Sequence, residues 1–139
     1  MQLKLVTLSG LKFDEEVYSV SIPTVDGEIS VFPSHEPLVT VAAPGVITVR
    51  RTKDTKDEEF LMISGGVVEI DQTGVRILVD EADHGDEIVE AEAQAALERA
   101  RQAHDEAGTQ IEREKAKQLM DRHMVRLKVA DLQRRKRRG

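Results

Sequence analysis

The spacing of apolar residues in this chain of 139 residues changes abruptly near residue 85. Up to about Asp80, apolar residues alternate with other residues, as in Tyr18, Val20 and Ile22. A period of two is typical of strands with one buried face. From residue 88 onward, apolar residues recur every three or four positions, which is the period of an amphipathic helix. The pattern predicts a β-sheet body followed by helices.

Short turns divide the first part into many strands. Turn signals occur at Ser9-Gly10, Asp26-Gly27, Pro44-Gly45, the polar run 52–57 and Thr73-Gly74. Many short strands joined by tight turns indicate an antiparallel β-sandwich or a flattened barrel. Gly65-Gly66 lies between two strand patterns without the context of a phosphate-binding loop, so it predicts a bulge or a close approach of two backbones.

The second part predicts two helices. The first helix, residues 88–107, presents a narrow face of small residues. The second, from about Gln110 to Arg138, presents a narrow apolar stripe. Gly108 ends the first helix, while Thr109 and Glu112 form a capping box for the second. Two helices with so short a connection must lie antiparallel. The two expected stripes are Ala93, Ala96, Leu97, Ala100, Ala103 and Ala107, and then Ala116, Leu119, Met120, His123, Leu127 and Ala130.

The predicted fold class is therefore α+β by segments, with a β-sandwich domain at 1–84 and a helical hairpin domain at 85–139. Helices with stripes this thin bury little area, so the hairpin needs another surface to pack against. Such marginal packing allows a conformational switch.

Composition excludes several kinds of site. The chain has no cysteine, and its four histidines show no ligand spacing, so we expect no disulfide, no metal site and no cofactor. No stretch approaches the roughly 18 apolar residues of a membrane span, and the N-terminus shows no signal or transit pattern, so no direct membrane insertion is expected. Aromatic residues make up 3% and the pI is about 5.3, which argues against binding of nucleic acid.

Charge differs between the two ends. Residues 1–87 hold 7 Lys and Arg against 17 Asp and Glu, whereas residues 122–139 hold 8 against 1. Two interpretations of the basic tail, Arg134 to Arg138, stay open: a solvated helix end that complements the helix dipole, or a contact with an acidic partner. The acidic residues Asp80, Glu81, Asp83, Asp86 and Glu87 fit no Ca²⁺-loop template and are interpreted as a solvated linker before the first helix.

Two motifs resemble the paired signature of the epsilon subunit of rotary ATP synthases. In that family the first motif runs Gly-Glu-x-Gly-Ile-x-Pro-x-His-x-Pro-Leu. Ser30 stands in place of its second glycine. The second motif is the run from Ile63 to Ile70. The residues that match the first motif are Gly27, Glu28, Pro33, His35, Pro37 and Leu38. The order of strands, turns and helices also follows the family along nearly the whole chain.

The resemblance implies a stalk protein without a catalytic site. Its sandwich would contact the gamma subunit and the membrane rotor ring of c subunits through Glu28, Phe32, Pro33 and His35. Its last helix would contact the catalytic alpha and beta subunits and inhibit ATP hydrolysis. The residues implied for that role are Leu119, Met120, Leu127 and Leu132 for packing, and Arg122, Arg126, Lys128, Arg134, Arg135, Lys136, Arg137 and Arg138 for charge. The implied location is peripheral, on the cytoplasmic face of the inner membrane or the stromal face of the thylakoid.

Some family members bind ATP weakly at the start of the first helix, through a segment resembling Ile/Leu-Asp-x-x-Arg-Ala. Here Val89 stands in place of the acid and Glu92 in place of the arginine. A carboxylate where a phosphate needs a cation predicts no strong nucleotide binding.

Two other functions stay open. A free adaptor domain could recruit a partner helix through its hairpin. An enzyme could use Glu28 and His35 as a catalytic pair, but no nucleophile or oxyanion arrangement accompanies them. The alternative for the loop that contains Pro33, His35 and Pro37 is a purely structural role, in which the prolines stiffen the connection and His35 caps backbone groups.

Overall fold

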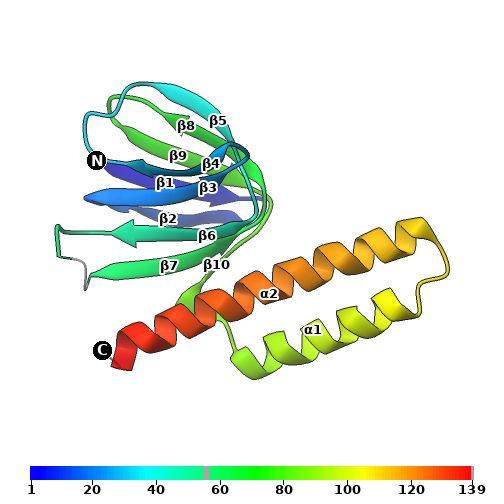
Figure 1. Cartoon of the computed structure of the whole chain (residues 1–139). Coiled ribbons are helices and arrows are strands. Elements are labelled where there is room, and N and C mark those ends of the chain that lie inside the picture. The colour runs from blue at the N-terminus through cyan, green and yellow to red at the C-terminus, as the bar shows by residue number, and fades with distance from the viewer. Residues whose placement is uncertain (55–56, 139) are drawn as a thin grey trace.

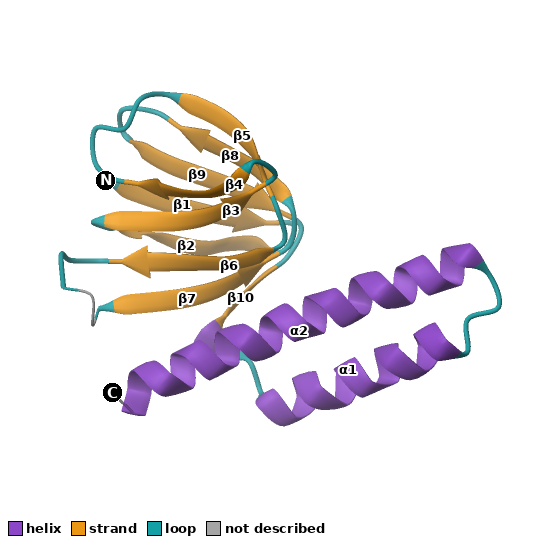
Figure 2. Ribbon diagram, in the orientation of Figure 1, coloured by secondary structure: helices purple, strands orange, loops and turns teal. Residues whose placement is uncertain are grey.

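A computed structural model describes residues 1–54 and 57–138, and the side chains of Arg137 and Arg138 lie outside the described part. Residues 55 and 56 of the expected turn at 52–57 also lie outside it. Figure 2 shows strands gathered in one body and two helices in a hairpin. The elements are β1 (Gln2–Thr7), β2 (Gly10–Glu16), β3 (Ser19–Thr24), β4 (Gly27–Val31), β5 (Leu38–Ala42), β6 (Gly45–Arg50), β7 (Glu58–Ile63), β8 (Gly66–Ile70), β9 (Gly74–Val79), β10 (Ala82–His84), the 3₁₀ turn η1 (Gly85–Glu87), α1 (Glu90–Asp105) and α2 (Gln110–Arg138).

The strands form two layers, which confirms the predicted sandwich. One layer runs β4-β3-β6-β7-β10 and the other β5-β8-β9-β1-β2. A single residue pair, Thr24 with Ala42, joins the layers at one corner among the described strands. The strands pair antiparallel except β1 with β9, which lie parallel. Figure 1 shows the two layers facing each other, with the hairpin below β7 and β10.

The alternating residues meet between the layers, as their period of two requires. Leu3 and Leu5 of β1, Val20 and Ile22 of β3, and Ile77 of β9 are almost completely buried there. Gly66 confirms the predicted close approach of two backbones, because a Cβ atom added there would lie 2.0 Å from the carbonyl oxygen of Leu78.

Arg51 joins the two layers at the side opposite the corner. Its guanidinium donates to Glu15 of β2 and to Glu59 of β7, and it lies over the ring of Phe13, 5.6 Å from the centroid. The hydrogen bond that Arg51 donates to Glu15, more than any other contact, raises the pKa of Arg51 above its ordinary value. The side chain is thus held charged where the two sheets meet.

The hairpin has the predicted connection, with one difference in its cap. Thr109 Oγ1 accepts a hydrogen bond from the Glu112 amide at 3.1 Å. The Glu112 carboxylate, however, accepts from the amide of Gly108 at 3.0 Å, one residue before the expected one. The apolar faces are narrower than predicted, since Ala103 is exposed and 41% of Leu119 remains exposed.

The second half of α2 packs on the sandwich through a separate apolar cluster. Phe60 and Met62 of β7 contact Val129 and Ala130 of α2 in this cluster. We call the set Phe60, Met62, Ile88, Ala93, Val129 and Ala130 the docking cluster. The hairpin therefore has the supporting surface that its thin stripes require, while its tip projects away from the strands (Figure 1).

Candidate interaction surfaces

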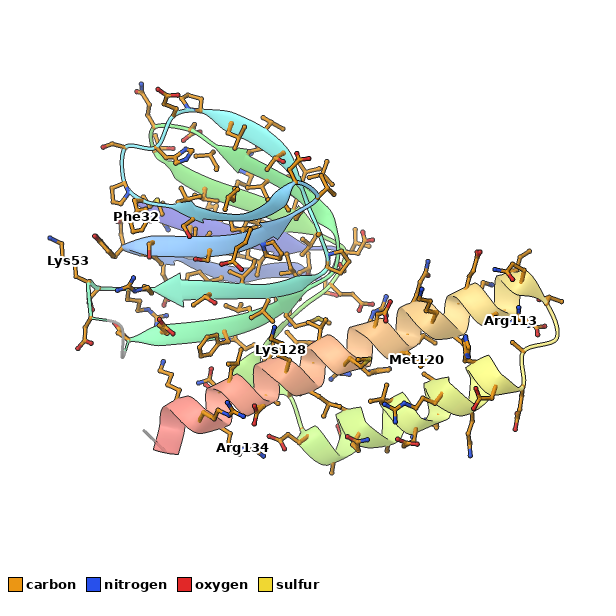
Figure 3. The ribbon with its side chains drawn as sticks, viewed as in Figure 1. Phe32, Lys53, Arg113, Met120, Lys128 and Arg134 are labelled. Atoms are coloured by element: carbon orange, nitrogen blue, oxygen red, sulfur yellow. The ribbon has the colours of Figure 1, made fainter. Side chains whose placement is uncertain are left out.

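The loop after β4 lies at the end of the sandwich that also holds the β6–β7 connection, as the labels of Phe32 and Lys53 in Figure 3 show. Phe32 is 43% exposed and packs edge-on against Tyr18, with ring centroids 5.7 Å apart. Ser34 has a φ of 69°, a left-handed conformation that is uncommon for a residue other than glycine. The loop therefore presents a partly exposed aromatic ring on a constrained backbone.

His35 lies in this loop, but Glu28 does not join it. The His35 Nδ1 atom lies 2.7 Å from the carbonyl oxygen of Glu36, which agrees with the expectation that it caps backbone. Glu28 pairs in register with Pro23 near the β3–β4 turn, whereas Val31 at the other end of β4 pairs with Val20. At roughly 3.3 Å per residue, about 13 Å of strand separates Glu28 from Phe32. Glu28 and His35, the pair that the enzyme alternative requires, thus lie at opposite ends of β4.

An exposed apolar row crosses the outer face of the second layer. Register places Val41 beside Val67, Val67 beside Leu78, Leu78 beside Val6, and Val6 beside Leu11. These five residues, the outer apolar row, come one from each strand of that layer, and Leu11 is 57% exposed. With strands about 4.8 Å apart, the row is roughly 19 Å long.

Sequence reasoning missed this row, because it counted only one face of each strand. Consecutive apolar residues such as Val67-Val68 and Ile77-Leu78 carried the signal, since neighbours on a strand point to opposite faces. A charged row borders it, with Glu69 and Arg76 paired at 3.6 Å. An apolar centre with a polar rim is typical of protein interfaces.

The basic residues of α2 meet the acidic segment after β9. Arg122 lies 3.3 Å from Glu81, and Arg126 lies 3.5 Å from Asp83. The interpretation of this segment as a solvated linker is therefore wrong in part. Four of its five acidic residues are exposed as expected, but Glu81 and Asp83 pair with α2, and residues 82–84 form a strand. Sequence reasoning could not pair charges some forty positions apart.

The basic tail is also engaged. Arg134 pairs with Glu90 of α1 at 2.9 Å and with Asp131, and Arg135 lies 3.1 Å from Asp131. Lys128 is exposed, Met120 is partly buried, and Leu127 and Leu132 pack against the docking cluster. Figure 3 labels Met120, Lys128 and Arg134 along α2. Of the residues predicted on α2, Leu127 and Leu132 thus face the sandwich, whereas Lys128 faces solvent.

Within residues 1–54 and 57–138, no three His, Cys, Asp or Glu side chains gather where they could hold a metal ion. No helix in the same part of the chain is long and apolar enough to cross a membrane.

The stretch that corresponds to the nucleotide-binding segment of some family members is Ile88–Ala93. Both of its end residues are buried, and Glu90 is bound by Arg134. The absence of strong nucleotide binding stays a prediction.

Comparison with known proteins identifies relatives over both parts of the chain. Residues 1–85 match the family model described as "ATP synthase, Delta/Epsilon chain, beta-sandwich domain". The ATP synthase epsilon chain of Herpetosiphon aurantiacus is 37% identical over 134 residues, covering 96% of this chain and 96% of the relative. That of Rippkaea orientalis is 33% identical, covering 94% and 96%.

A solved structure supports the same relation. A chain in the mitochondrial ATP synthase of Euglena gracilis, from a structure of its OSCP, F1 and c-ring, superposes with a TM-score of 0.76 at 27% identity. The match covers 94% of this chain and 79% of that chain. The similarity thus extends to the helical hairpin.

Proposed function

Because the chain belongs to the ATP synthase delta/epsilon family, we propose that it is a non-catalytic subunit that turns with the gamma subunit and the c-ring. In this role the sandwich joins the gamma shaft to the ring and passes rotation between proton flow and the catalytic head. In this role the chain would lie at the membrane periphery, on the cytoplasmic face of the inner membrane or the stromal face of a thylakoid.

The outer apolar row is the observation that carries this proposal. A row of five neighbouring apolar side chains, one from every strand of a layer, is unusual on a solvated surface and marks a protein contact. Its straight form suits a rod-shaped partner, and we assign it to the gamma subunit. The loop with Phe32, Pro33 and His35 lies at one end of the sandwich and is assigned to the polar loops of the c-ring.

The hairpin is assigned a regulatory role. Its helix α2 presents cations at Arg135, Lys136 and Lys128 that fit an acidic loop of the catalytic subunits. In the folded arrangement, Arg122, Arg126 and Arg134 are occupied by carboxylates of the same chain. Docking on the head requires these pairs to break, so the two arrangements compete for the same arginines.

A matched pair of substitutions tests the gamma contact. Val67→Asp places a charge inside the outer apolar row, between Val41 and Leu78, whereas Val25→Asp places the same charge on an exposed turn outside it. We expect Val67→Asp to abolish co-purification with gamma while Val25→Asp leaves it intact. Circular dichroism of both variants controls for folding.

The outcome separates the proposal from the adaptor alternative. If a folded Val67→Asp chain still binds gamma at wild-type affinity, the row is not the contact. If the wild-type chain, recovered from its native source, brings no ATP synthase subunit with it, the whole assignment fails.

A further inference from the structure

His123 lies on α2 between the tip of the hairpin and the docking cluster, in the stretch between Met120 and Lys128 labelled in Figure 3. The side chain is half-buried. Its Nδ1 atom is enclosed and has no hydrogen-bond partner among the described residues. An enclosed ring nitrogen without a partner lacks the groups that normally stabilise an imidazolium ion.

The charges around this imidazole are positive. Arg122 and Arg126 flank it on α2, and Arg99 acts on it from α1. The carboxylates that the sandwich contributes nearby, Glu81 and Asp83, are bound to Arg122 and Arg126. Burial first, and then Arg126, Arg122 and Arg99, lower the pKa of His123 below its ordinary 6.5.

We propose that His123 is a proton sensor at the contact between α1 and α2, and that its protonation opens the hairpin. A proton on this ring adds a fourth positive charge beside three arginines, in a place where the ring has no acceptor for it. When the helices separate, the ring moves away from Arg99 and enters water, and the unfavourable interactions are relieved.

The direction of the pH effect follows from linkage. The neutral ring is favoured in the closed hairpin, so the full closed stability is present above about pH 6.5, the ordinary pKa of histidine. As pH falls below that value, the open hairpin binds the proton first, and the ratio of closed to open molecules falls by at most about tenfold per pH unit. The loss levels off once pH is below the lowered pKa of the closed state.

This inference rests on the proposed function and deepens it, because separation of α1 from α2 would break the pair of Arg134 with Glu90 and free that arginine for the catalytic head. Acidification of the compartment around the head would then shift the chain toward the inhibitory arrangement. The opening itself is a property of the chain alone, and it can be measured without the complex.

Because the chain has no cysteine of its own, spin labels attach only at the two cysteines introduced for the distance measurement. Ala95→Cys on α1 and Lys128→Cys on α2, both exposed positions, carry spin labels in the full chain. Between pH 7.5 and 5.5 we expect the ratio of the short-distance to the long-distance population to fall several-fold, within the tenfold-per-unit limit. NMR of the imidazole should show His123 titrating below 6.5 in the closed chain.

Three substitutions in the labelled chain isolate the sensor. His123→Gln should remain closed at both pH values, and His123→Lys should be open already at pH 7.5. His104→Gln, at another histidine of the hairpin, should keep the wild-type pH dependence. A pH-dependent opening that persists in His123→Gln, or a His123 pKa at or above 6.5, overturns the inference. A general loss of closure in His123→Gln with the pH slope unchanged also overturns it, since the role would then be structural.

ATP hydrolysis by the assembled complex provides the separate functional measurement. If the hairpin opens with acid but hydrolysis is insensitive to His123→Gln, the sensor stands and the inhibitory role fails. If the hairpin does not respond to pH, the sensor fails whatever the complex does.

Discussion

At the scale of single residues, Gly66 shows most directly how the backbone limits substitution. A Cβ atom there meets the Leu78 carbonyl at 2.0 Å, and the next nearest atoms are also backbone, so no side chain can move aside. Gly66→Ala should lower the free energy of unfolding by about 2 kcal/mol or more. Gly108→Ala is the matched control, because its nearest neighbour is the Glu112 carboxylate at 3.9 Å and its change should stay within about 0.5 kcal/mol. Urea titration of both variants measures the difference, and equal stabilities would contradict the close approach.

Asp71 supplies a residue-scale prediction about pH. Its Oδ1 atom accepts hydrogen bonds from the Thr73 hydroxyl at 2.6 Å, the Thr73 amide at 2.8 Å and the Gly74 amide at 3.1 Å. The hydroxyl first, and then the two amides, lower the pKa of Asp71 below 3.8. The stabilisation of this β8–β9 turn is therefore complete above pH 3.8 and is lost as pH falls through the lowered value. Amide chemical shifts of Thr73 and Gly74 should follow that titration, and Asp71→Asn, which keeps an acceptor oxygen but cannot titrate, should remove it.

At the scale of elements, the docking of α2 depends on a few buried side chains. Val129 has no exposed surface and lies in the docking cluster against β7. Val129→Asp would bury an unpaired carboxylate, which costs about 3 kcal/mol or more, so the hairpin should leave the sandwich. Met124→Asp, on the same helix but 51% exposed, should leave it docked. Hydrogen exchange should become fast in α1 and α2 for the first variant only, with the strands still protected.

The elements themselves could be predicted from local patterns, whereas their contacts could not. Alternation at Val20 and Ile22 and the cap at Thr109 are set within a few residues, so the sandwich strands and the hairpin were predictable. The pairing of Arg122 with Glu81 depends on the packing of α2 against β7, which no local pattern specifies. The outer apolar row depends on register across five strands. Glu28 and His35 share one motif, yet the extended backbone of β4 keeps them apart.

At the scale of the whole molecule, two apolar cores divide the chain into parts with different stability. The core between the sheets consists entirely of residues from 1 to 82, so it does not need the helices. The hairpin, in contrast, packs on the sandwich through the smaller docking cluster and through ion pairs that are partly exposed. Partly exposed pairs contribute little each and weaken with salt. The hairpin should therefore open at a much lower free energy than the sandwich unfolds.

This division predicts what removal of the helices does to the assembled ATP synthase. A chain that ends at Glu87 keeps the whole inter-sheet core, the outer apolar row and the Phe32 loop, so it should still join the rotor. Because the inhibitory contact is assigned to α2, ATP hydrolysis by the complex should rise about 5-fold or more, as expected for loss of a coupling between sites.

In the full chain, Arg135→Gln with Lys136→Gln should reproduce part of the increase, whereas Lys115→Gln with Lys117→Gln near the hairpin tip should not. Normal assembly with unchanged hydrolysis would leave the rotor role standing and rule out regulation by the hairpin. Failure of the shortened chain to assemble would show instead that the sandwich depends on the helices, against the separation of the two cores.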